Sequence, residues 1–283
     1  MLKNLSLTSN KIDLHIHSKF SDGLLSPSEI VDTAIKIGLK VISITDHDSI
    51  FGVDEALTRA NRRIEVIPAV EMSSNIGNLD IHILGYYIDH HSKALLSFLE
   101  EFREYREKRV KKIIEKLLVD GIKIDFERVK EIATNAAMGR PHIAEVLKEN
   151  GYVHSISEAF IRYLGYHSPY YVPKKTAKPK EVIKKIKDCG GVPVLAHPGT
   201  IGQDSEIIYV LIKDGILGLE VWHPEHSKRQ VDEFYEIGIK NGLILTGGSD
   251  FHGYPRGHSS IGECGCGMES VCDLKKLSVK LRD

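Results

Sequence analysis

Seven short apolar runs recur along the chain, and each carries histidine, aspartate or glutamate at or near its end. The runs are rich in β-branched residues and too short for helices, and most are separated by stretches with helical spacing. This alternation is typical of parallel strands joined by crossover helices. In parallel α/β barrels the carboxyl ends of the strands meet on one face, where catalytic side chains lie. The pattern therefore predicts an α/β barrel with a polar cluster on one rim.

The polar segments at these strand ends share a small set of residue types that bind metal ions. They are Asp13-Leu14-His15-Ile16-His17 with Asp22, Thr45-Asp46-His47-Asp48, Glu71, His82, Ala196-His197-Pro198, Glu220-Val221-Trp222-His223 and Ser249-Asp250-Phe251-His252. A single histidine of this kind is more often a satisfied core residue or a solvated one. Nine ligand-type residues at ordered positions reverse that expectation and predict a site with more than one metal ion.

Helix signals support the alternation of strands and helices. They also suggest roles other than metal binding for two aspartates near the rim. Ser26 and Pro27 are typical of a helix start, Glu29 supplies an acidic first turn, and Gly38 marks the end of that helix. We expect Asp48 to cap a following helix rather than to act in catalysis. Asp46 is expected to accept an N–H group from a metal-binding imidazole.

Residues 91–175 interrupt the alternation of strands and helices, so we predict a helical cap inserted into a discontinuous barrel of residues 11–90 and 176–270. Apolar residues recur there at helical spacing from Leu95 to Leu117. The inserted segment has a net charge of +4 and the remainder of the chain −5. The prediction is therefore a mildly basic cap over an acidic barrel, with a concave pocket between them.

Within the cap, Gly139-Arg140-Pro141-His142 places an arginine at a predicted helix start. A guanidinium and free backbone N–H groups together favour a phosphate. The alternative is a surface arginine that lies beside a helix start by coincidence.

At these residues the chain resembles the PHP (polymerase and histidinol phosphatase) family of metal-dependent phosphoesterases. The shared marks are D-x-H-x-H, T-D-H, an isolated Glu, an isolated His, A-H-P and S-D-x-H, in that order. The resemblance implies a distorted seven-stranded (β/α) barrel that binds up to three divalent metal ions. It implies three sets of ligands, with Glu71 shared by two ions: His15, His17, Glu71 and Asp250; Glu71, His82 and His197; and Asp22, His47 and His252.

The resemblance also implies a role for the cap. Small members of the family with a similar insertion use a motif like that at Arg140 and His142 to hold the substrate phosphate. His223 ends its own strand, and we expect it to bind phosphate or to protonate the leaving group, with a core role as the alternative. His226 and His258 are weaker candidates.

The donor set itself narrows the choice of cofactor. Imidazole and carboxylate without thiolate suit Zn²⁺, Mn²⁺ or Fe²⁺, and we expect two to three such ions. Adjacent cations lower the pKa of a shared water and stabilise charge on the attacking and leaving oxygens. We therefore expect a metal-bridging hydroxide to attack phosphorus in line.

The predicted substrate is a small phosphorylated molecule. Similarity to small stand-alone PHP proteins implies release of the 3′-phosphate from a nucleoside 3′,5′-bisphosphate, or stepwise 5′→3′ hydrolysis of short 5′-phosphorylated RNA. Histidinol phosphate is the alternative substrate, and a non-catalytic metal-binding scaffold is the alternative of another class. A net charge of −1 argues against long duplex DNA as a partner.

Composition limits the cellular setting. The chain has neither a signal-peptide pattern nor an apolar run long enough to cross a membrane, so we expect no membrane partner and a cytoplasmic location. The four cysteines do not form the pattern of an extracellular disulfide framework.

Overall fold

The computed structural model describes residues 11–77, 79–133, 137–173, 177–202, 206–253 and 259–282, so His258 lies outside the described residues. Seven strands form one sheet in the order of the sequence. They are β1 (Ile12–Ile16), β2 (Val41–Ile44), β3 (Glu65–Ile76), β4 (Leu79–Tyr86), β5 (Val192–Leu195), β6 (Gly218–Trp222) and β7 (Ile244–Gly247). This arrangement confirms the predicted seven-stranded α/β barrel.

Two strand pairs depart from the predicted parallel arrangement. β4 runs antiparallel to both β3 and β5, whereas the other neighbouring pairs are parallel. Only two residues separate β3 from β4, and so short a connection can join only antiparallel strands. His82 therefore lies within β4 and not at its carboxyl end.

The barrel nearly closes where β1 meets the segment that follows β7. The backbone N–H of His17 donates to the Phe251 carbonyl at 2.9 Å, and that of Asp250 donates to the His15 carbonyl at 2.8 Å. Gly248 permits this approach, because a Cβ atom there would lie 2.3 Å from the Cβ of His15. The first and last strands thus bring residues from opposite ends of the chain together.

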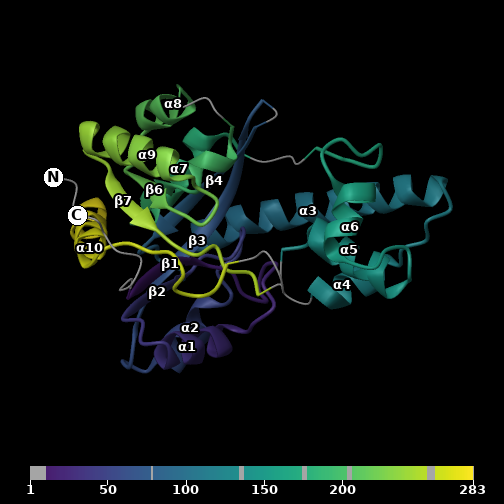
Figure 1. Cartoon of the computed structure of the whole chain (residues 1–283), viewed down its shortest axis with the longest axis horizontal. Coiled ribbons are helices and arrows are strands. Elements are labelled where there is room, and N and C mark those ends of the chain that lie inside the picture. The colour runs from purple at the N-terminus through teal and green to yellow at the C-terminus, as the bar shows by residue number, and fades with distance from the viewer. Residues whose placement is uncertain are drawn as a thin grey trace.

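Helices surround the sheet, and α3 extends from the barrel to a separate group of helices (Figure 1). They are α1 (Pro27–Lys36), α2 (Val53–Ala60), α3 (Lys93–Val119), α4 (Phe126–Ala133), α5 (Arg140–Glu149), α6 (Ile156–Ala159), α7 (Pro179–Asp188), α8 (Glu206–Asp214), α9 (Lys228–Lys240) and α10 (Met268–Arg282), with a π-helical turn at Phe160–Leu164 and a 3₁₀ turn at Pro198–Thr200. The predicted start of α1 is confirmed, because Ser26 and Glu29 form a capping box.

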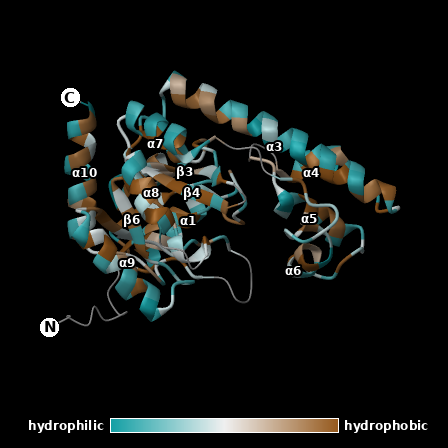
Figure 2. Ribbon diagram, turned by 90° about the horizontal axis from the view of Figure 1, so that it is seen from above, coloured by the Kyte–Doolittle hydropathy of each residue, from teal (hydrophilic) through white to brown (hydrophobic). Residues whose placement is uncertain are grey.

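The inserted helices have a hydrophobic core of their own. A cluster of buried apolar residues runs from Val110 on α3 to Leu164 and contains no residue of a strand. The first half of α3 instead packs on the barrel core through Leu95, Leu99 and Phe102. Figure 2 shows α3 joining the two groups. On this basis we propose residues 91–175 as the bounds of the cap.

None of the helices within the described ranges is long and apolar enough to cross a membrane.

Replacing Leu147 by alanine should test whether the cap depends on this second core. Leu147 is fully buried on α5, and truncation of such a side chain leaves a cavity. We expect the free energy of unfolding, measured in urea, to fall by about 2–5 kcal/mol.

Leu118→Ala is the matched control, because Leu118 lies on α3 with 54% of its surface exposed. Its effect should stay within about 0.5 kcal/mol. Equal losses in the two variants would contradict a packed core in the insertion.

Candidate functional site

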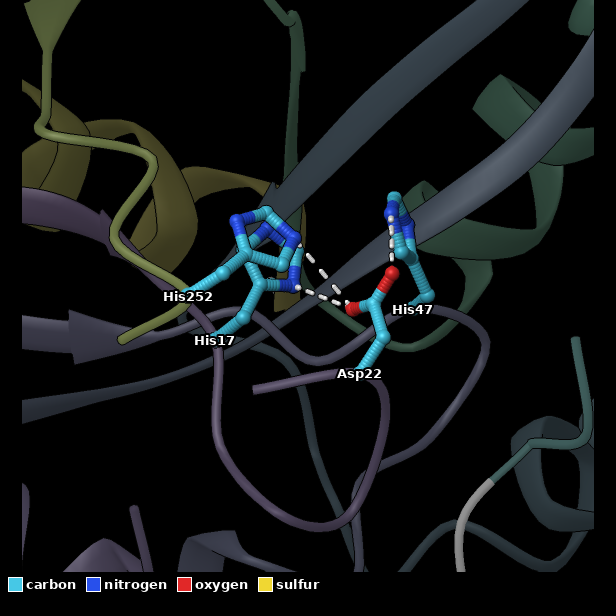
Figure 3. Close-up of side chains that lie close together, drawn as sticks. All are labelled: His17, Asp22, His47 and His252. Atoms are coloured by element: carbon cyan, nitrogen blue, oxygen red, sulfur yellow. Dashed lines mark ion pairs between the residues drawn. The ribbon is translucent and has the colours of Figure 1, made fainter. Parts of the chain in front are cut away.

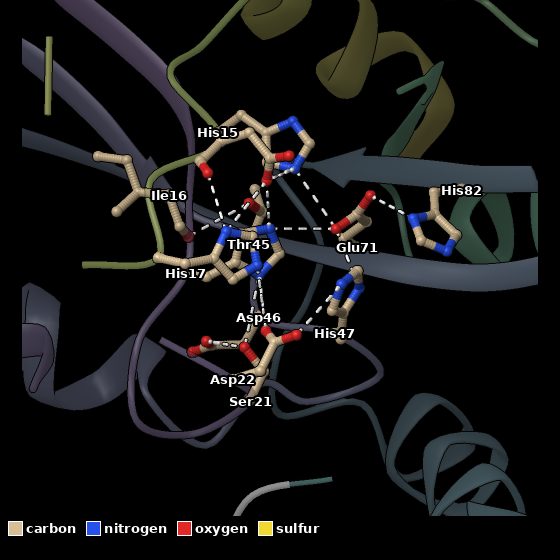
Figure 4. A network of polar contacts seen from close by, with 12 residues as sticks. His15, Ile16, His17, Ser21, Asp22, Thr45, Asp46, His47, Glu71 and His82 are labelled. Atoms are coloured by element: carbon tan, nitrogen blue, oxygen red, sulfur yellow. Dashed lines mark hydrogen bonds and ion pairs between the residues drawn. The ribbon is translucent and has the colours of Figure 1, made fainter. Parts of the chain in front are cut away.

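Glu71 lies at the centre of the rim, buried near the middle of β3. Its Oε2 lies within 3.4 Å of three imidazoles and its Oε1 within 3.0 Å of two more. The five contacting nitrogens are His15 Nε2 at 3.4 Å, His17 Nε2 at 3.2 Å, His47 Nδ1 at 3.0 Å, His82 Nδ1 at 3.0 Å and His197 Nε2 at 3.0 Å. Figure 4 shows several of these rings pointing toward the carboxylate from different strands. A single carboxylate is therefore shared by histidines from four parts of the sheet.

Asp250 and Asp22 lie on either side of this centre. Asp250 Oδ1 is 3.0 Å from His17 Nε2 and 3.4 Å from His15 Nε2. Asp22 Oδ1 is 3.3 Å from His252 Nε2, and its Oδ2 is 3.9 Å from His47 Nε2, as Figure 3 shows. The rim thus alternates carboxylates and imidazoles across adjacent groups.

All nine predicted ligand residues fall into overlapping groups whose donor atoms lie within 4.8 Å of one another. The groups are His17, Asp22, His47 and His252; His15, His197 and Asp250; His15, His17 and Glu71; and His47, Glu71 and His82. The second group differs from the predicted sets, because it places His197 beside His15 and Asp250 as well as beside Glu71. The structure brings the residues together, and their roles as ligands remain our proposal.

The donor atoms fit divalent metal ions. Among the described residues, His15 Nε2, His17 Nε2, His47 Nδ1, Asp22 Oδ1 and Glu71 Oε2 are buried and make ion-pair contacts within the cluster but no well-oriented hydrogen bond. Buried polar atoms without well-oriented hydrogen bonds are costly, so the convergence of these atoms fits a metal ion as a shared partner. Imidazole and carboxylate are suitable donors for Zn²⁺, Mn²⁺ or Fe²⁺.

The carboxylates and imidazoles of this cluster shift one another's pKa values. Burial opposes the charged form of Glu71, yet the surrounding imidazoles hold the pKa of its carboxyl well below the usual range. Burial likewise disfavours a charged His17, yet Asp250 and Glu71 raise the pKa of this imidazole to about 10. Metal binding releases such protons, so the cluster can exchange them for metal ions.

Glu220 is a buried carboxylate beside the cluster that the sequence analysis did not select as part of the site. It is fully buried on β6, 3.0 Å from His15 Nδ1, and it accepts the backbone N–H of His197 at 2.7 Å. A carboxylate that receives the outer N–H of a ligating imidazole fixes the orientation of that ring. Only its place in a strand, two residues before Trp222, pointed to it in the sequence.

Two predictions about neighbouring aspartates are wrong. Asp46 accepts hydrogen bonds from Ser18 and Ser21, and within the described residues its hydrogen-bonded link to an imidazole passes through the Ser21 hydroxyl, 3.4 Å from His17 Nδ1. It therefore shapes the loop that presents Asp22.

Asp48 is not a helix cap, because Gly52 occupies that position in α2. Its buried carboxylate instead accepts a hydrogen bond from Arg106 Nε at 2.9 Å and from the Ser73 backbone N–H at 2.8 Å. Tertiary contacts to α3 and β3 override the local preference for a cap.

His223 lies against the rim and is 5% exposed. Its Nδ1 accepts the backbone N–H of Glu225 at 3.2 Å, so the proton of a neutral ring belongs on Nε2, which is 3.3 Å from Asp250 Oδ2. The neutral ring thus presents the N–H group at Nε2 to the cluster. This placement is compatible with the predicted role in catalysis or phosphate binding and with the alternative core role.

The cap supplies three arginines close to one another. Arg106 and Arg109 lie nearly one turn apart on α3, and Arg140 begins α5. Arg109 is only 9% exposed, and burial together with its two neighbouring arginines lowers its pKa to about 10. Among the described residues, neither Arg109 nor Arg140 forms an ion pair. Their guanidinium groups donate to backbone carbonyls instead, Arg109 Nε to that of Val172 and Arg140 Nη1 to that of Leu164.

His142 connects the cap to the rim. Its Nδ1 accepts the backbone N–H of Gly139 at 3.0 Å, and it contacts the backbone of Ser21 beside Asp22. Burial lowers the pKa of this imidazole, which favours the neutral ring. This placement makes His142 a link between α5 and the Asp22 loop, and its predicted contact with substrate stays a prediction.

Comparison with known proteins supports the resemblance to the PHP family over most of the chain. The PHP domain profile matches residues 13–245. A 3′,5′-nucleoside bisphosphate phosphatase of Chromobacterium violaceum is 34% identical over 257 residues, covering 89% of this chain and 90% of the relative. A 5′-3′ exoribonuclease of Haemophilus influenzae is 34% identical over 260 residues, covering 90% of this chain and 94% of the relative.

A solved structure shows the same fold. A crystal structure described as a metal-dependent phosphoesterase from Bifidobacterium adolescentis superposes with a TM-score of 0.87 and 30% identity, covering 94% of this chain and 96% of the other. These matches confirm the predicted class of enzyme, a metal-dependent hydrolase of phosphate esters. The chain belongs to the PHP domain family.

Proposed function

We propose that this enzyme hydrolyses the 3′-phosphate of nucleoside 3′,5′-bisphosphates and removes nucleotides stepwise from the 5′ end of short RNA. One observation carries the proposal: the buried Arg109 and the half-buried Arg140 form no ion pair within the described residues, and they lie next to Arg106, which pairs with Asp48 beside the rim residue His47. Burying uncompensated cations is costly unless an anion joins them. A second phosphate on the substrate is the anion that would satisfy this demand.

Neighbouring residues and side-chain contacts connect the rim to Arg109 and Arg140. Asp48 follows His47 directly and pairs with Arg106, whose guanidinium also reaches the Ser73 hydroxyl at 3.2 Å. Arg109 is the next residue on the same side of α3, and its pKa is lowered in part by Arg140. A substrate with two phosphates can thus place one at the metal cluster and the other at the arginines.

Three aromatic rings surround the Arg140 guanidinium. The Arg140 guanidinium lies 4.9 Å from the Tyr166 ring centre, 5.5 Å from that of Phe160 and 5.7 Å from that of Tyr171. Such cation–π contacts hold the guanidinium in place without neutralising it. The charge therefore remains available to a phosphate.

The two reactions require the same recognition. Both cleave a phosphate ester on the 3′ side of a nucleotide that bears a 5′-phosphate, so one arginine pocket can serve both. The relatives are named for these two activities. The substrate that we propose is therefore a nucleotide or short RNA.

We further propose that two to three divalent ions, Mn²⁺, Zn²⁺ or Fe²⁺, bind to the nine rim residues. When bound, such ions activate water and neutralise charge on the reacting phosphate. Glu71 contacts His15 and Asp250 contacts His17, which fixes the positions of these imidazoles. Glu220 orients the His15 ring and accepts the backbone N–H of His197. His223, our candidate for a catalytic and substrate-binding role, presents an N–H group at Nε2 that can donate a hydrogen bond to the substrate phosphate or to the leaving oxygen.

A parallel assay tests the substrate assignment. Protein loaded with Mn²⁺ should release phosphate from adenosine 3′,5′-bisphosphate, and nucleotides from a 5′-phosphorylated RNA oligomer, with a higher kcat/KM than from AMP or histidinol phosphate. The physical reason is that AMP and histidinol phosphate offer only one phosphate to two phosphate sites. Metal-free protein is the control and should be inactive.

Preference for histidinol phosphate would replace the nucleotide assignment and keep the metal site. Absence of turnover with Mn²⁺, Zn²⁺ and Fe²⁺ would favour the non-catalytic scaffold.

Arg140→Ala should lower kcat/KM for adenosine 3′,5′-bisphosphate by about 10–100-fold, as expected for loss of a charge-assisted contact of about 1.5–3 kcal/mol. For adenosine 3′-monophosphate, which lacks the 5′-phosphate, the same substitution should have little effect. Steady-state kinetics on the two substrates measures the difference.

Arg162→Ala is the matched control, because Arg162 lies in the same insertion but pairs with Glu158 on the surface. An equal loss on both substrates in Arg140→Ala would contradict 5′-phosphate recognition by Arg140.

Glu220→Gln should lower turnover or metal affinity by about 10–100-fold, since the amide keeps the shape of the side chain but weakens the contact that orients His15. Metal titration followed by activity would separate the two effects. Glu225→Gln, at an exposed position in the following loop, should behave like the parent enzyme. Unchanged metal affinity and unchanged kcat in Glu220→Gln would exclude this positioning role.

A further inference from the structure

A second cluster of potential metal ligands lies outside the rim and shares no residue with it. Asp54 is in the first turn of α2, and His90 and His91 lie in the segment between β4 and α3. His90 Nε2 is 2.9 Å from Asp54 Oδ1, and His91 Nε2 is 3.7 Å from the same oxygen. The three donor atoms lie within 4.8 Å of one another.

These separations match the geometry of a tetrahedral metal ion. Bonds of about 2.0–2.1 Å to Zn²⁺ at tetrahedral angles place neighbouring ligand atoms about 3.3 Å apart. The observed 2.9 and 3.7 Å lie on either side of that value. The two imidazole rings, with centres 4.1 Å apart and planes inclined at 40°, can turn their nitrogens to one ion.

The segment that carries the histidines is fixed by hydrogen bonds. The Asp89 N–H donates to the Cys189 carbonyl at 2.9 Å, and the His91 N–H donates to Asp89 Oδ1 at 3.0 Å. Ser92 then caps α3 by accepting the Leu95 N–H. The His90 ring is only 14% exposed, so little side-chain freedom would be lost on binding.

The opposite side of the cluster is open to solvent. The side chains of Asp54 and His91 are 67% and 71% exposed. An ion held by the three donors could therefore complete its coordination with water. Two imidazoles and one carboxylate favour a late first-row ion over Mg²⁺ or Ca²⁺, which prefer oxygen ligands.

We propose that Asp54, His90 and His91 bind one divalent late first-row transition-metal ion, with Zn²⁺ as the representative, at an accessory site. The ion links the first turn of α2 to the segment that leads into α3. Because α3 carries Arg106 and Arg109, this link would restrain the helix that holds the cap arginines over the rim. The proposal is independent of the substrate assignment.

Zinc counting on variants of the full chain tests the site. The protein must carry no histidine tag, and it is equilibrated by dialysis against Zn²⁺ before the metal is measured by atomic absorption. His91→Gln and Asp54→Asn should each bind one Zn²⁺ fewer per chain than the parent protein. His167→Gln, at another exposed histidine, should bind as many ions as the parent protein.

Equal zinc counts in the parent protein and in both cluster variants would overturn the proposal. Anomalous diffraction at the zinc edge from crystals of the parent protein gives a measurement that needs no variant. A peak about 2.0–2.2 Å from His90 Nε2, His91 Nε2 and Asp54 Oδ1 is expected, and its absence from crystals equilibrated with Zn²⁺ would also overturn the site.

Discussion

The buried carboxylate of Glu71, shared by five imidazoles, is the interaction on which the rim depends. A carboxylate removed from water is strongly unfavourable unless cations or donors surround it, so the strands must deliver these partners together. The antiparallel register of β3 and β4 shows how this is achieved: Ser73 lies opposite His82, which places the imidazole diagonally beside Glu71 on the same face of the sheet. A slip of one residue would turn His82 away and leave the carboxylate short of a partner.

The same requirement extends from the barrel into the cap. Arg106 on α3 contacts Asp48 and Ser73. Asp48 directly follows His47 in the sequence, and Ser73 lies two residues after Glu71. Removing one partner of such a buried pair leaves an uncompensated charge, so the start of the cap is tied to the rim energetically and not only through the chain. The cap thereby brings a surplus of positive charge to an acidic rim, which is the distribution that a substrate with several phosphates needs.

Local signals in the sequence predicted much of this arrangement, and contacts between distant elements account for what they missed. Histidine, aspartate and glutamate at or near the ends of the β-branched runs pointed to the nine residues that the structure brings together at the rim, and Ser26 with Pro27 identified the start of α1, because these features depend on neighbours in sequence. Glu220 lies in one of these segments, but nothing in the local pattern distinguishes a carboxylate that orients an imidazole from an ordinary strand glutamate, and Arg109 has the ordinary pattern of a helix arginine. Asp48 was misassigned for the same reason: its sequence resembles a helix cap, but its carboxylate is claimed by Arg106 on α3.

The contacts that close the barrel also position residues of the proposed metal site. Asp13 accepts the backbone N–H groups of Ser249 at 2.9 Å and Gly262 at 2.8 Å, although burial raises the pKa of its carboxyl to about 6. This seam sets Asp250 beside His15 and His17, which come from the opposite end of the described chain. The predicted ligands His15 and His17 therefore gain Asp250 as a neighbour only when the segment after β7 has docked. Ions that bind only the closed rim must stabilise the closed barrel by mass action, so metal binding and folding are thermodynamically coupled at this seam.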